Sequence, residues 1–476
     1  MKIILTVHQF FPDYFSGTEV LTFSVAKELL RRGHAVSVYT GYPARQSMLD
    51  AERFDKYQID GIDVFRFHHA FVPMGEQHTV SEVEYNNRLS AQQFAGIVEK
   101  VKPDLVHFFH FSRLSAALVD VVHQFRVPSY YTPTDFWAVC PTSQLLLGDG
   151  RVCGGPSRHG GNCVKHVATM TGWEPYASIV QRLPDFAIDA AAWMAKSLSA
   201  PRFPLKAEIA ALGDRKRFNI ARLNALQGIV SPTKLMTKVL TSNGVKPGLI
   251  TQSAYGIDVT GFDSVQREHS KRDWLTFGYI GTLAPHKGCH VLLEAFCRLA
   301  NRAGSRLKIF GNPNDFPDYV AKLRQIAEGN RSIEFCGTFP NDRIAEVLSG
   351  IDALIVPSVW YENTPLVVYS ALAAKCPVIA SDFAGMSEVI QHEVNGLLFK
   401  PGDANALREQ LSRFENEPKL EAELSGNCQP PKSIATYVDE LLALYERSLN
   451  APRSCLVDGQ STESVSQTYR YRVVEK

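Results

Sequence analysis

Apolar runs alternate with amphipathic stretches along the chain, and in the amino-terminal half they predict an α/β region. Leu21, Val25 and Leu29 fall at helical spacing in a helix predicted over residues 18–32, and a second helix is predicted over 112–125. The predicted strands are the near-continuous apolar runs 2–8, 35–41, 103–109 and 128–132. Such strands between helices are typical of a parallel sheet covered on both faces.

The carboxyl-terminal half repeats this pattern with shorter connections. The predicted strands are residues 275–281, 306–311, 332–337, 352–358, 377–381 and 396–399. The predicted helices are residues 289–300, 317–328, 341–349, 365–375 and 404–414. Because strand, glycine-bearing turn and helix recur in this order, the pattern predicts a doubly wound α/β sheet.

The chain has 476 residues, a length that suits two domains. We expect one Rossmann-like domain over residues 1–245, a second over 246–430 and a long helix over 431–450. The first domain contains a cysteine-rich loop at 140–166 and a segment at 165–226 with a helical pattern. The tail at 451–476 is polar and lacks periodicity, so we expect it to be disordered.

Composition limits the classes of partner. The net charge of +1 provides no basic excess for nucleic acid, so we expect no nucleic-acid partner. Nine cysteines in so long a chain are too sparse for a disulfide scaffold. No window approaches 18 uncharged apolar residues, and the apolar start is too short for a signal peptide. These features predict a soluble, cytoplasmic protein.

Three turns that follow predicted strands suit an anionic ligand. Thr364 and Pro365 fit the N-cap and first position of the helix at 365–375, where free N–H groups and the helix dipole attract anions. The turn "GTLAPHKG" at 281–288 adds Lys287, and Gly17 lets a ligand approach the backbone closely. Each turn alone could be an ordinary capped helix, but the three together favour an anionic ligand held between two sheets.

Four longer segments carry a family resemblance. "GTLAPHKGCHVLLEAF", "IDALIVPSVWYENTPLVVYSALAAKCPVIASDFAGMSEVI" and "NGLLFKPGD" resemble the nucleotide-sugar domain of family 4 retaining glycosyltransferases, glycosyl transferases group 1. "LTVHQFFPDYFSGTEVLTFSVAKELLRRGHAVSVYTG" is similar to the acceptor domain of that family. The resemblance covers roughly residues 1–447. It implies the GT-B architecture: two Rossmann-like doubly wound domains face each other across a cleft that holds the active site, and the helix at 431–450 crosses back to the first domain.

The resemblance also implies the roles of individual residues. Glu362 matches the first glutamate of the family's signature, in which a second glutamate eight residues later holds the ribose; here that position is Ser370, a weaker partner. Thr282 stands where many members carry an arginine for the diphosphate, which leaves Lys287 to hold the phosphates. Glu362 and Lys287 are therefore the catalytic candidates. The implied donor-binding residues are Gly17, Gly281, Thr282, Lys287, Asn363, Thr364, Leu366, Ser370 and Glu388.

Candidate sugar or acceptor contacts lie in the first domain. Thr134 stands beside Asp135, at a position where many members place a histidine that faces the donor sugar. His107 and His110 lie at the end of a predicted strand, where either could reach the substrate; the alternative is that both are structural histidines.

The function that the resemblance implies is a retaining hexosyltransferase. It would use a UDP- or GDP-sugar and a saccharide or lipid-linked acceptor in polysaccharide or glycoconjugate biosynthesis, with no cofactor or metal required for catalysis. Retention could arise by double displacement or by same-face attack guided by the leaving phosphate, and the resemblance favours same-face attack. Two alternatives remain: another GT-B enzyme, such as an epimerase, and a degenerate, non-catalytic GT-B nucleotide-binding or assembly protein, which Ser370 and Thr282 would suit.

Two further features allow alternative interpretations. Cys140, Cys153, Cys163 and His166 could form a structural zinc site or could be separate side chains in a loop. The apolar helical surface near Trp193 and Met194 could contact the inner face of the membrane peripherally or pack against the first domain.

Overall fold

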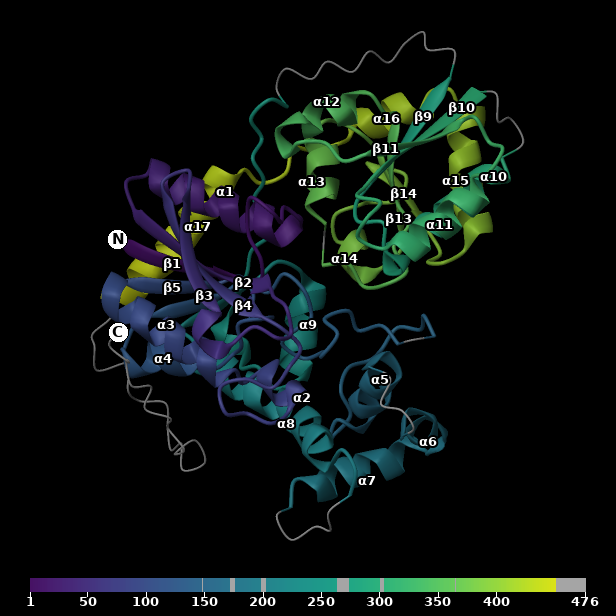
Figure 1. Cartoon of the computed structure of the whole chain (residues 1–476). Coiled ribbons are helices and arrows are strands. Elements are labelled where there is room, and N and C mark those ends of the chain that lie inside the picture. The colour runs from purple at the N-terminus through teal and green to yellow at the C-terminus, as the bar shows by residue number, and fades with distance from the viewer. Residues whose placement is uncertain are drawn as a thin grey trace. The chain divides into compact units, whose positions relative to one another are not determined.

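The computed structural model describes residues 1–147, 149–171, 176–197, 203–262, 274–299, 304–363 and 365–450. Thr364 and the tail at 451–476 lie outside the described residues. The chain divides into two compact units (Figure 1). The first unit consists of Met1–Pro232, Met236–Ala254 and the chain from Ala435 onward, and the second consists of Thr233–Leu235 and Tyr255–Ile434.

The first unit contains an eight-stranded sheet in the order β3-β4-β2-β1-β5-β6-β7-β8. The strands are β1 (Lys2–Val7), β2 (Ala35–Pro43), β3 (Phe54–Ile59), β4 (Ile62–His69), β5 (Leu105–Phe108), β6 (Ser129–Tyr131), β7 (Gly228–Ser231) and β8 (Ile250–Gln252). Only the β3–β4 pair is antiparallel, and every other neighbouring pair in this sheet is parallel. The strand order reverses direction between β1 and β5, so the sheet has a topological switch point there.

The helices of this unit are α1 (Gly17–Arg31), α2 (Val80–Val83), α3 (Arg88–Val101), α4 (Leu118–Gln124), α5 (Gly161–Thr171), α6 (Tyr176–Arg182), α7 (Asp185–Ala195), α8 (Lys206–Leu223), α9 (Lys234–Ser242) and α17 (Ile434–Asn450). The last helix is held by buried polar contacts. The Tyr445 hydroxyl lies 2.6 Å from Nδ1 of His107, and the Tyr130 hydroxyl donates to the Leu444 carbonyl at 2.7 Å. These contacts attach α17 to β5 and β6.

The second unit contains a six-stranded parallel sheet in the order β11-β10-β9-β12-β13-β14 (Figure 1). The strands are β9 (Leu275–Ile280), β10 (Ser305–Phe310), β11 (Ile333–Gly337), β12 (Ala353–Val356), β13 (Val378–Ser381) and β14 (Gly396–Phe399). The chain first builds outward from β9 to β11 and then returns to place β12 on the other side of β9. The switch point of this sheet therefore lies between β9 and β12.

The helices of this unit are α10 (Cys289–Cys297), α11 (Pro317–Ile326), α12 (Ile344–Ser349), α13 (Leu366–Ala373), α14 (Ala384–Ser387), α15 (Ala404–Asn416) and α16 (Leu420–Gly426). Residues of α10, α11, α15 and α16 pack with one face of the sheet in a single apolar core. Phe296 and Phe414 both contact Phe277 of the central strand, with ring centroids 6.4 and 6.0 Å away. Aromatic burial of this kind fixes β9 at the centre of the unit.

Two predictions of local structure are wrong. The helix expected over 112–125 begins only at Leu118, because Arg113 and Ser115 have positive φ angles of 63° and 103°, which an α-helix excludes. Pro365, expected at the first helical position, lies at the N-cap with ψ of 137°, and Leu366 begins α13. The backbone at Pro365 is therefore still extended.

Candidate active site

Two loops meet at the switch point of the second unit. One follows β9 and contains Lys287; the other follows β12 and contains Glu362. The N–H of Val359 donates to the carbonyl of His286 at 3.0 Å, which joins the loops directly. Parallel α/β sheets bind ligands outside the carboxyl ends of the strands at such a switch point, so topology alone marks this position.

Gly288 allows the two loops to approach each other. Its φ of +71° is left-handed, and a Cβ at this position would lie 1.9 Å from the Pro357 carbonyl oxygen. Only glycine fits both requirements. Gly288 also precedes α10 directly, so the same residue sets the start of that helix beside the β12 loop.

Glu362 accepts three hydrogen bonds on a single oxygen, Oε1. Lys287 Nζ lies 2.7 Å away, Ser358 Oγ 2.7 Å and Trp360 Nε1 2.8 Å. Glu362 is only 4% exposed, whereas the Lys287 side chain is 24% exposed. The pair therefore combines a buried, oriented carboxylate with an ammonium group that solvent can reach.

Electrostatics keep this carboxylate ionised. Burial raises the pKa of Glu362, but the Lys287 charge and the hydrogen bonds from Lys287, Ser358 and Trp360 outweigh burial and hold the pKa below its ordinary value. Burial and the Lys287 charge lower the pKa of His286 to about 4, so this histidine is neutral at physiological pH. The Lys287 ammonium also lies 4.9 Å from the centroid of the Trp360 ring.

The first unit has its own polar cluster, at the switch point between β1 and β5. His8 follows β1 and His110 follows β5, and their ring centroids are 4.3 Å apart. Nε2 of His110 lies 2.8 Å from Oδ2 of Asp135, and Nε2 of His8 lies 3.2 Å from Oε1 of Glu19. Glu19 is fully buried in the first turn of α1, and burial raises the pKa of its carboxyl. Burial, together with the charges of His110 and Arg113, lowers the pKa of His8 well below its usual range.

These geometries agree with the comparisons to known proteins. Residues 263–429 match the family model described as glycosyl transferases group 1. The Anabaena HepE protein, whose crystal structure contains UDP and glucose, aligns with a TM-score of 0.59 at 16% identity over 94% of this chain and all of that one. Both units also have the mostly parallel, doubly wound sheets described above. The fold is GT-B.

Sequence relatives of this GT-B chain cover part of its length. It is 30% identical over 129 residues to an uncharacterized glycosyltransferase of Methanocaldococcus jannaschii, which is 27% of this chain and 33% of the relative. It is 29% identical over 204 residues to the amylovoran biosynthesis glycosyltransferase AmsK of Erwinia amylovora, which is 40% of this chain and 49% of the relative. The chain thus spans about a third and about a half of these relatives.

Two predicted donor-binding side chains have partners within the second unit. Oδ1 of Asn363 accepts from the Thr233 hydroxyl at 2.8 Å. The carboxylate of Glu388 accepts from the N–H groups of Lys234 and Leu235 at 2.6 and 2.9 Å, in the short segment Thr233–Leu235 that belongs to this unit. Both side chains therefore have partners in the segment Thr233–Leu235, and their assignment to the donor stays a prediction.

The other predicted donor contacts lie on turns and on α13. Ser370 is 7% exposed, and its hydroxyl donates to the Leu366 carbonyl at 3.2 Å, a bond within the helix. The carbonyl of Thr282 accepts from the Tyr279 hydroxyl at 2.8 Å, in the turn that Gly281 begins. In the first unit, Gly17 is exposed as the first residue of α1.

The histidines at the end of β5 differ in environment. His107 is fully buried, with Nδ1 bonded to Tyr445 and Nε2 lying 2.8 Å from the Thr132 hydroxyl. Its contacts fit the structural alternative. His110 instead belongs to the polar cluster with Asp135, and the neighbouring Thr134 hydroxyl donates to the Phe109 carbonyl at 3.4 Å.

The cysteine-rich loop gives no support to a zinc site. Cys140, Cys153 and Cys163 are free thiols, and within the described parts of the chain no group of three or more His, Cys, Asp or Glu side chains is arranged to hold a metal. Burial, reinforced by the neighbouring Cys140 and Cys153, raises the pKa of the Cys163 thiol to about 12. The arrangement fits the alternative of separate thiols.

Several residues of both clusters were missed by the sequence reasoning. Ser358 and Trp360 orient Glu362, and His8 and Glu19 build the cluster of the first unit. A signal was available for His8 and Ser358, because each lies just after a strand at the switch point of its sheet. Nothing comparable in the sequence indicates that Glu19 is buried.

The described helices include none with the length and apolar character needed to cross a bilayer.

Proposed function

We propose that this protein is a retaining hexosyltransferase. It transfers a sugar from a UDP- or GDP-sugar to a saccharide or lipid-linked acceptor in the synthesis of a polysaccharide or glycoconjugate. The match of residues 263–429 to glycosyl transferases group 1 and the GT-B fold support sugar transfer. The amylovoran relative supports a polysaccharide as the product class.

The observation that carries the proposal is the pairing of Lys287 with Glu362. The two side chains meet 2.7 Å apart at the switch point of the second unit, within the residues that match the family model. A buried carboxylate beside a partly exposed ammonium, next to the start of a helix, suits a ligand that carries both sugar hydroxyls and a diphosphate.

The chemistry assigns a different task to each partner. Negative charge builds on the leaving diphosphate in the transition state, and Lys287 and the N–H groups at the start of α10 and α13 stabilise it. Glu362 stays ionised at neutral pH, so it accepts hydrogen bonds from sugar hydroxyls and orients the ring. Same-face attack, with the departing phosphate accepting the acceptor proton, then gives retention without a covalent intermediate on Glu362.

The remaining predicted residues have supporting parts in this proposal. Ser370 takes the position of a ribose-binding acid and binds the ribose more weakly than a carboxylate would. Gly281, Thr282, Asn363, Thr364, Leu366 and Glu388 form or support the donor site. In the first unit, Gly17 approaches the donor phosphates, and His110, Thr134 and Asp135 contact the sugar or acceptor.

A second candidate is a GT-B protein that binds a nucleotide without transferring sugar. The observation that favours it concerns Ser370, at the position where the resemblance expects a charged residue that binds the ribose. The Ser370 hydroxyl instead donates a hydrogen bond to the Leu366 carbonyl within the helix. Such a protein would bind UDP or GDP and leave every nucleotide sugar intact.

Mass spectrometry of sugar transfer separates the two candidates. The protein is incubated with a panel of UDP- and GDP-hexoses and with saccharide and lipid-linked acceptors. The proposal expects a product one hexose heavier than its acceptor with one donor, and the anomeric configuration of the donor should be kept when the product is examined by NMR. Micromolar binding of UDP or GDP without any product would favour the non-catalytic candidate, and an inverted product would contradict retention.

A further inference from the structure

Helices α5, α6 and α7 form a small helical platform in the first unit (Figure 1). Its core is a cluster of apolar side chains from α5, α7 and α8: Val164, Ile188, Ala192, Ala195, Ile209 and Leu212. Because these residues fill only one side of α7, the core leaves the opposite side of that helix uncovered.

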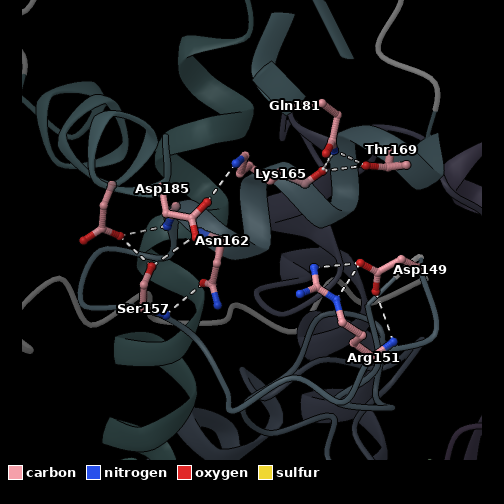
Figure 2. A network of polar contacts seen from close by, with 10 residues as sticks. Asp149, Arg151, Ser157, Asn162, Lys165, Thr169, Gln181 and Asp185 are labelled. Carbon is pink, nitrogen blue, oxygen red and sulfur yellow. Dashed lines mark hydrogen bonds and ion pairs between the residues drawn. The ribbon is translucent and has the colours of Figure 1, made fainter. Parts of the chain in front are cut away.

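Polar contacts hold the platform in place. Oδ1 of Asp189 accepts hydrogen bonds from the Ser157 hydroxyl at 2.6 Å and from the Gly161 N–H at 3.0 Å. A Cβ at Gly161 would lie 2.5 Å from the Asp189 nitrogen, so glycine allows α5 and α7 to meet. Lys165 Nζ lies 2.8 Å from Oδ1 of Asp185 (Figure 2), and this contact joins α5 to the first turn of α7.

The same network holds α6. Gln181 Nε2 donates to the Lys165 carbonyl at 2.8 Å and also bonds the Thr169 hydroxyl (Figure 2). The side chains that α6 and α7 present to solvent therefore sit on helices fixed by hydrogen bonds.

Helix α7 is apolar on two opposite sides. Ile188, Ala192 and Ala195 face the core of the platform. On the opposite side, Phe186 is 78% exposed, and Trp193, seven residues further along, is 61% exposed. Residues seven apart lie on the same side of a helix, so the exposed side is a continuous apolar stripe. The prediction that this region packs into the first domain is wrong for Trp193.

We call six exposed side chains of α6, α7 and their connection the apolar surface. They are Tyr176, Ile179, Leu183, Phe186, Trp193 and Met194, each between 37% and 78% exposed. Half of all exposed large hydrophobic residues in the described chain lie between residues 170 and 194. Exposed apolar side chains that share one side of a helix, as Phe186 and Trp193 do, mark an interaction site, whereas single scattered ones carry no such meaning.

The segment that includes this surface is net basic. Residues 151–217 contain ten Lys or Arg and five Asp or Glu, a net charge of +5 in a chain whose total is +1. The rest of the chain is therefore net −4. On the platform, Asp185 is paired with Lys165, and Asp189 is bonded to the start of α5. Arg182, between Ile179 and Leu183, is exposed and has no ion pair among the described residues.

The apolar surface and its net basic segment together favour a bilayer over a second copy of this chain as the binding partner. A symmetric dimer through the apolar surface would place two +5 segments against each other, which opposes association. An anionic bilayer instead attracts the basic residues, while aromatic and aliphatic side chains enter the boundary between headgroups and acyl chains. Trp and Tyr side chains are enriched at that depth.

We propose that the apolar surface docks the protein on an anionic phospholipid bilayer, with α7 lying along the membrane surface. The proposal rests on this surface and its charge, and it holds whether or not the second unit transfers sugar. Docking would bring the protein to an acceptor that is anchored in the same bilayer.

Vesicle flotation tests the proposal directly. The full chain is mixed with vesicles of equal parts phosphatidylcholine and phosphatidylglycerol, and separately with phosphatidylcholine alone. We expect the protein to float with the anionic vesicles and far less with the neutral ones. The double variant Phe186→Ser/Trp193→Ser should partition at least about tenfold more weakly, because two apolar anchors are lost. Arg182→Gln should weaken binding to the anionic vesicles about fivefold.

A matched control is Phe71→Ser, which removes a comparably exposed aromatic residue, 64% exposed, elsewhere in the first unit. It should float like the wild type. Circular dichroism would verify that all variants keep their helices. The single variant Trp193→Phe keeps an apolar ring and should float like the wild type. The proposal is overturned if the wild type stays in the soluble fraction with both kinds of vesicle, or if the double variant floats as well as the wild type. Light scattering that finds a wild-type dimer dissociated by Phe186→Ser/Trp193→Ser would identify a second copy as the occupant instead.

Discussion

Removing the Lys287 ammonium should destabilise the second unit in a way that depends on pH. In Lys287→Met the buried Glu362 carboxylate loses the ammonium group that lies 2.7 Å away, and it keeps the hydrogen bonds from Ser358 and Trp360. Removing one partner of a buried ion pair costs about 3–5 kcal/mol. Since the Lys287 side chain is 24% exposed and two donors remain, we expect a loss of about 2 kcal/mol at neutral pH.

The sign of the pH dependence follows from the pKa of Glu362. In the wild type this pKa lies below the ordinary value of 4.5, so the pair stabilises the fold above that value and the stabilisation is lost as pH falls. In Lys287→Met burial is no longer opposed by the ammonium, so the pKa of Glu362 should rise above its ordinary value. The variant should then be stabilised as the carboxyl takes up a proton, and its deficit relative to the wild type should shrink in acid.

Urea denaturation at neutral and mildly acidic pH measures this deficit, and hydrogen exchange of β9 and β12 peptides assigns it to the second unit. Lys322→Met, which removes an exposed lysine from α11, is the matched control and should change little. The double variant Lys287→Met/Glu362→Gln should recover part of the loss, since no buried charge remains unpaired. A deficit below about 0.5 kcal/mol at neutral pH, or one that is the same at both pH values, would refute the electrostatic reasoning.

Three further predictions concern single positions. Burial lowers the pKa of His107 from 6.5 to about 3. Below pH 6.5 the wild type should therefore lose about 1.4 kcal/mol of its stability advantage over His107→Gln per pH unit, as measured by urea denaturation. A stability advantage that does not change with pH would contradict this. Ser370→Glu should tighten nucleotide diphosphate binding about fivefold in calorimetry, with no gain for a 2′,3′-dideoxy nucleotide, if the site accepts a charged ribose partner; weaker binding by a folded variant would argue against that contact. A Cβ at Gly385 would lie 1.9 Å from the Glu362 carbonyl oxygen, so Gly385→Ala should destabilise the second unit by about 1–3 kcal/mol, and wild-type stability would refute the close packing.

Much of the fold follows from the sequence because its strands are short apolar runs between helices. β9 and β12 fall within predicted runs, β10 overlaps its predicted run, and the doubly wound arrangement follows from their alternation with helices. The β3–β4 hairpin was missed although its turn, Asp60-Gly61, has the left-handed φ angles of 48° and 79° that favour these residue types. The Asp-Gly pair is thus a hairpin signal that the sequence itself carries.

The candidate site was predictable in its location and less so in its contacts. Lys287 and Glu362 each follow a strand, so topology brings them to the same edge of the sheet. That they form an ion pair, with Trp360 and Ser358 on the same carboxylate oxygen, depends on loop conformations that periodicity does not encode. The exposure of Trp193 was equally hidden, because an apolar helical pattern alone cannot tell a core face from a free face.

The release of nucleoside diphosphate from UDP- and GDP-sugars, compared between the wild type and Glu362→Gln, tests the central claim most directly. The variant keeps Lys287 for the phosphates and loses the charged acceptor that orients the sugar. The account predicts that the wild type turns over one of the donors, and that the variant does so about a hundredfold more slowly while its affinity for UDP or GDP changes little. Equal rates for the two proteins, or no turnover of any donor by the wild type, would contradict it.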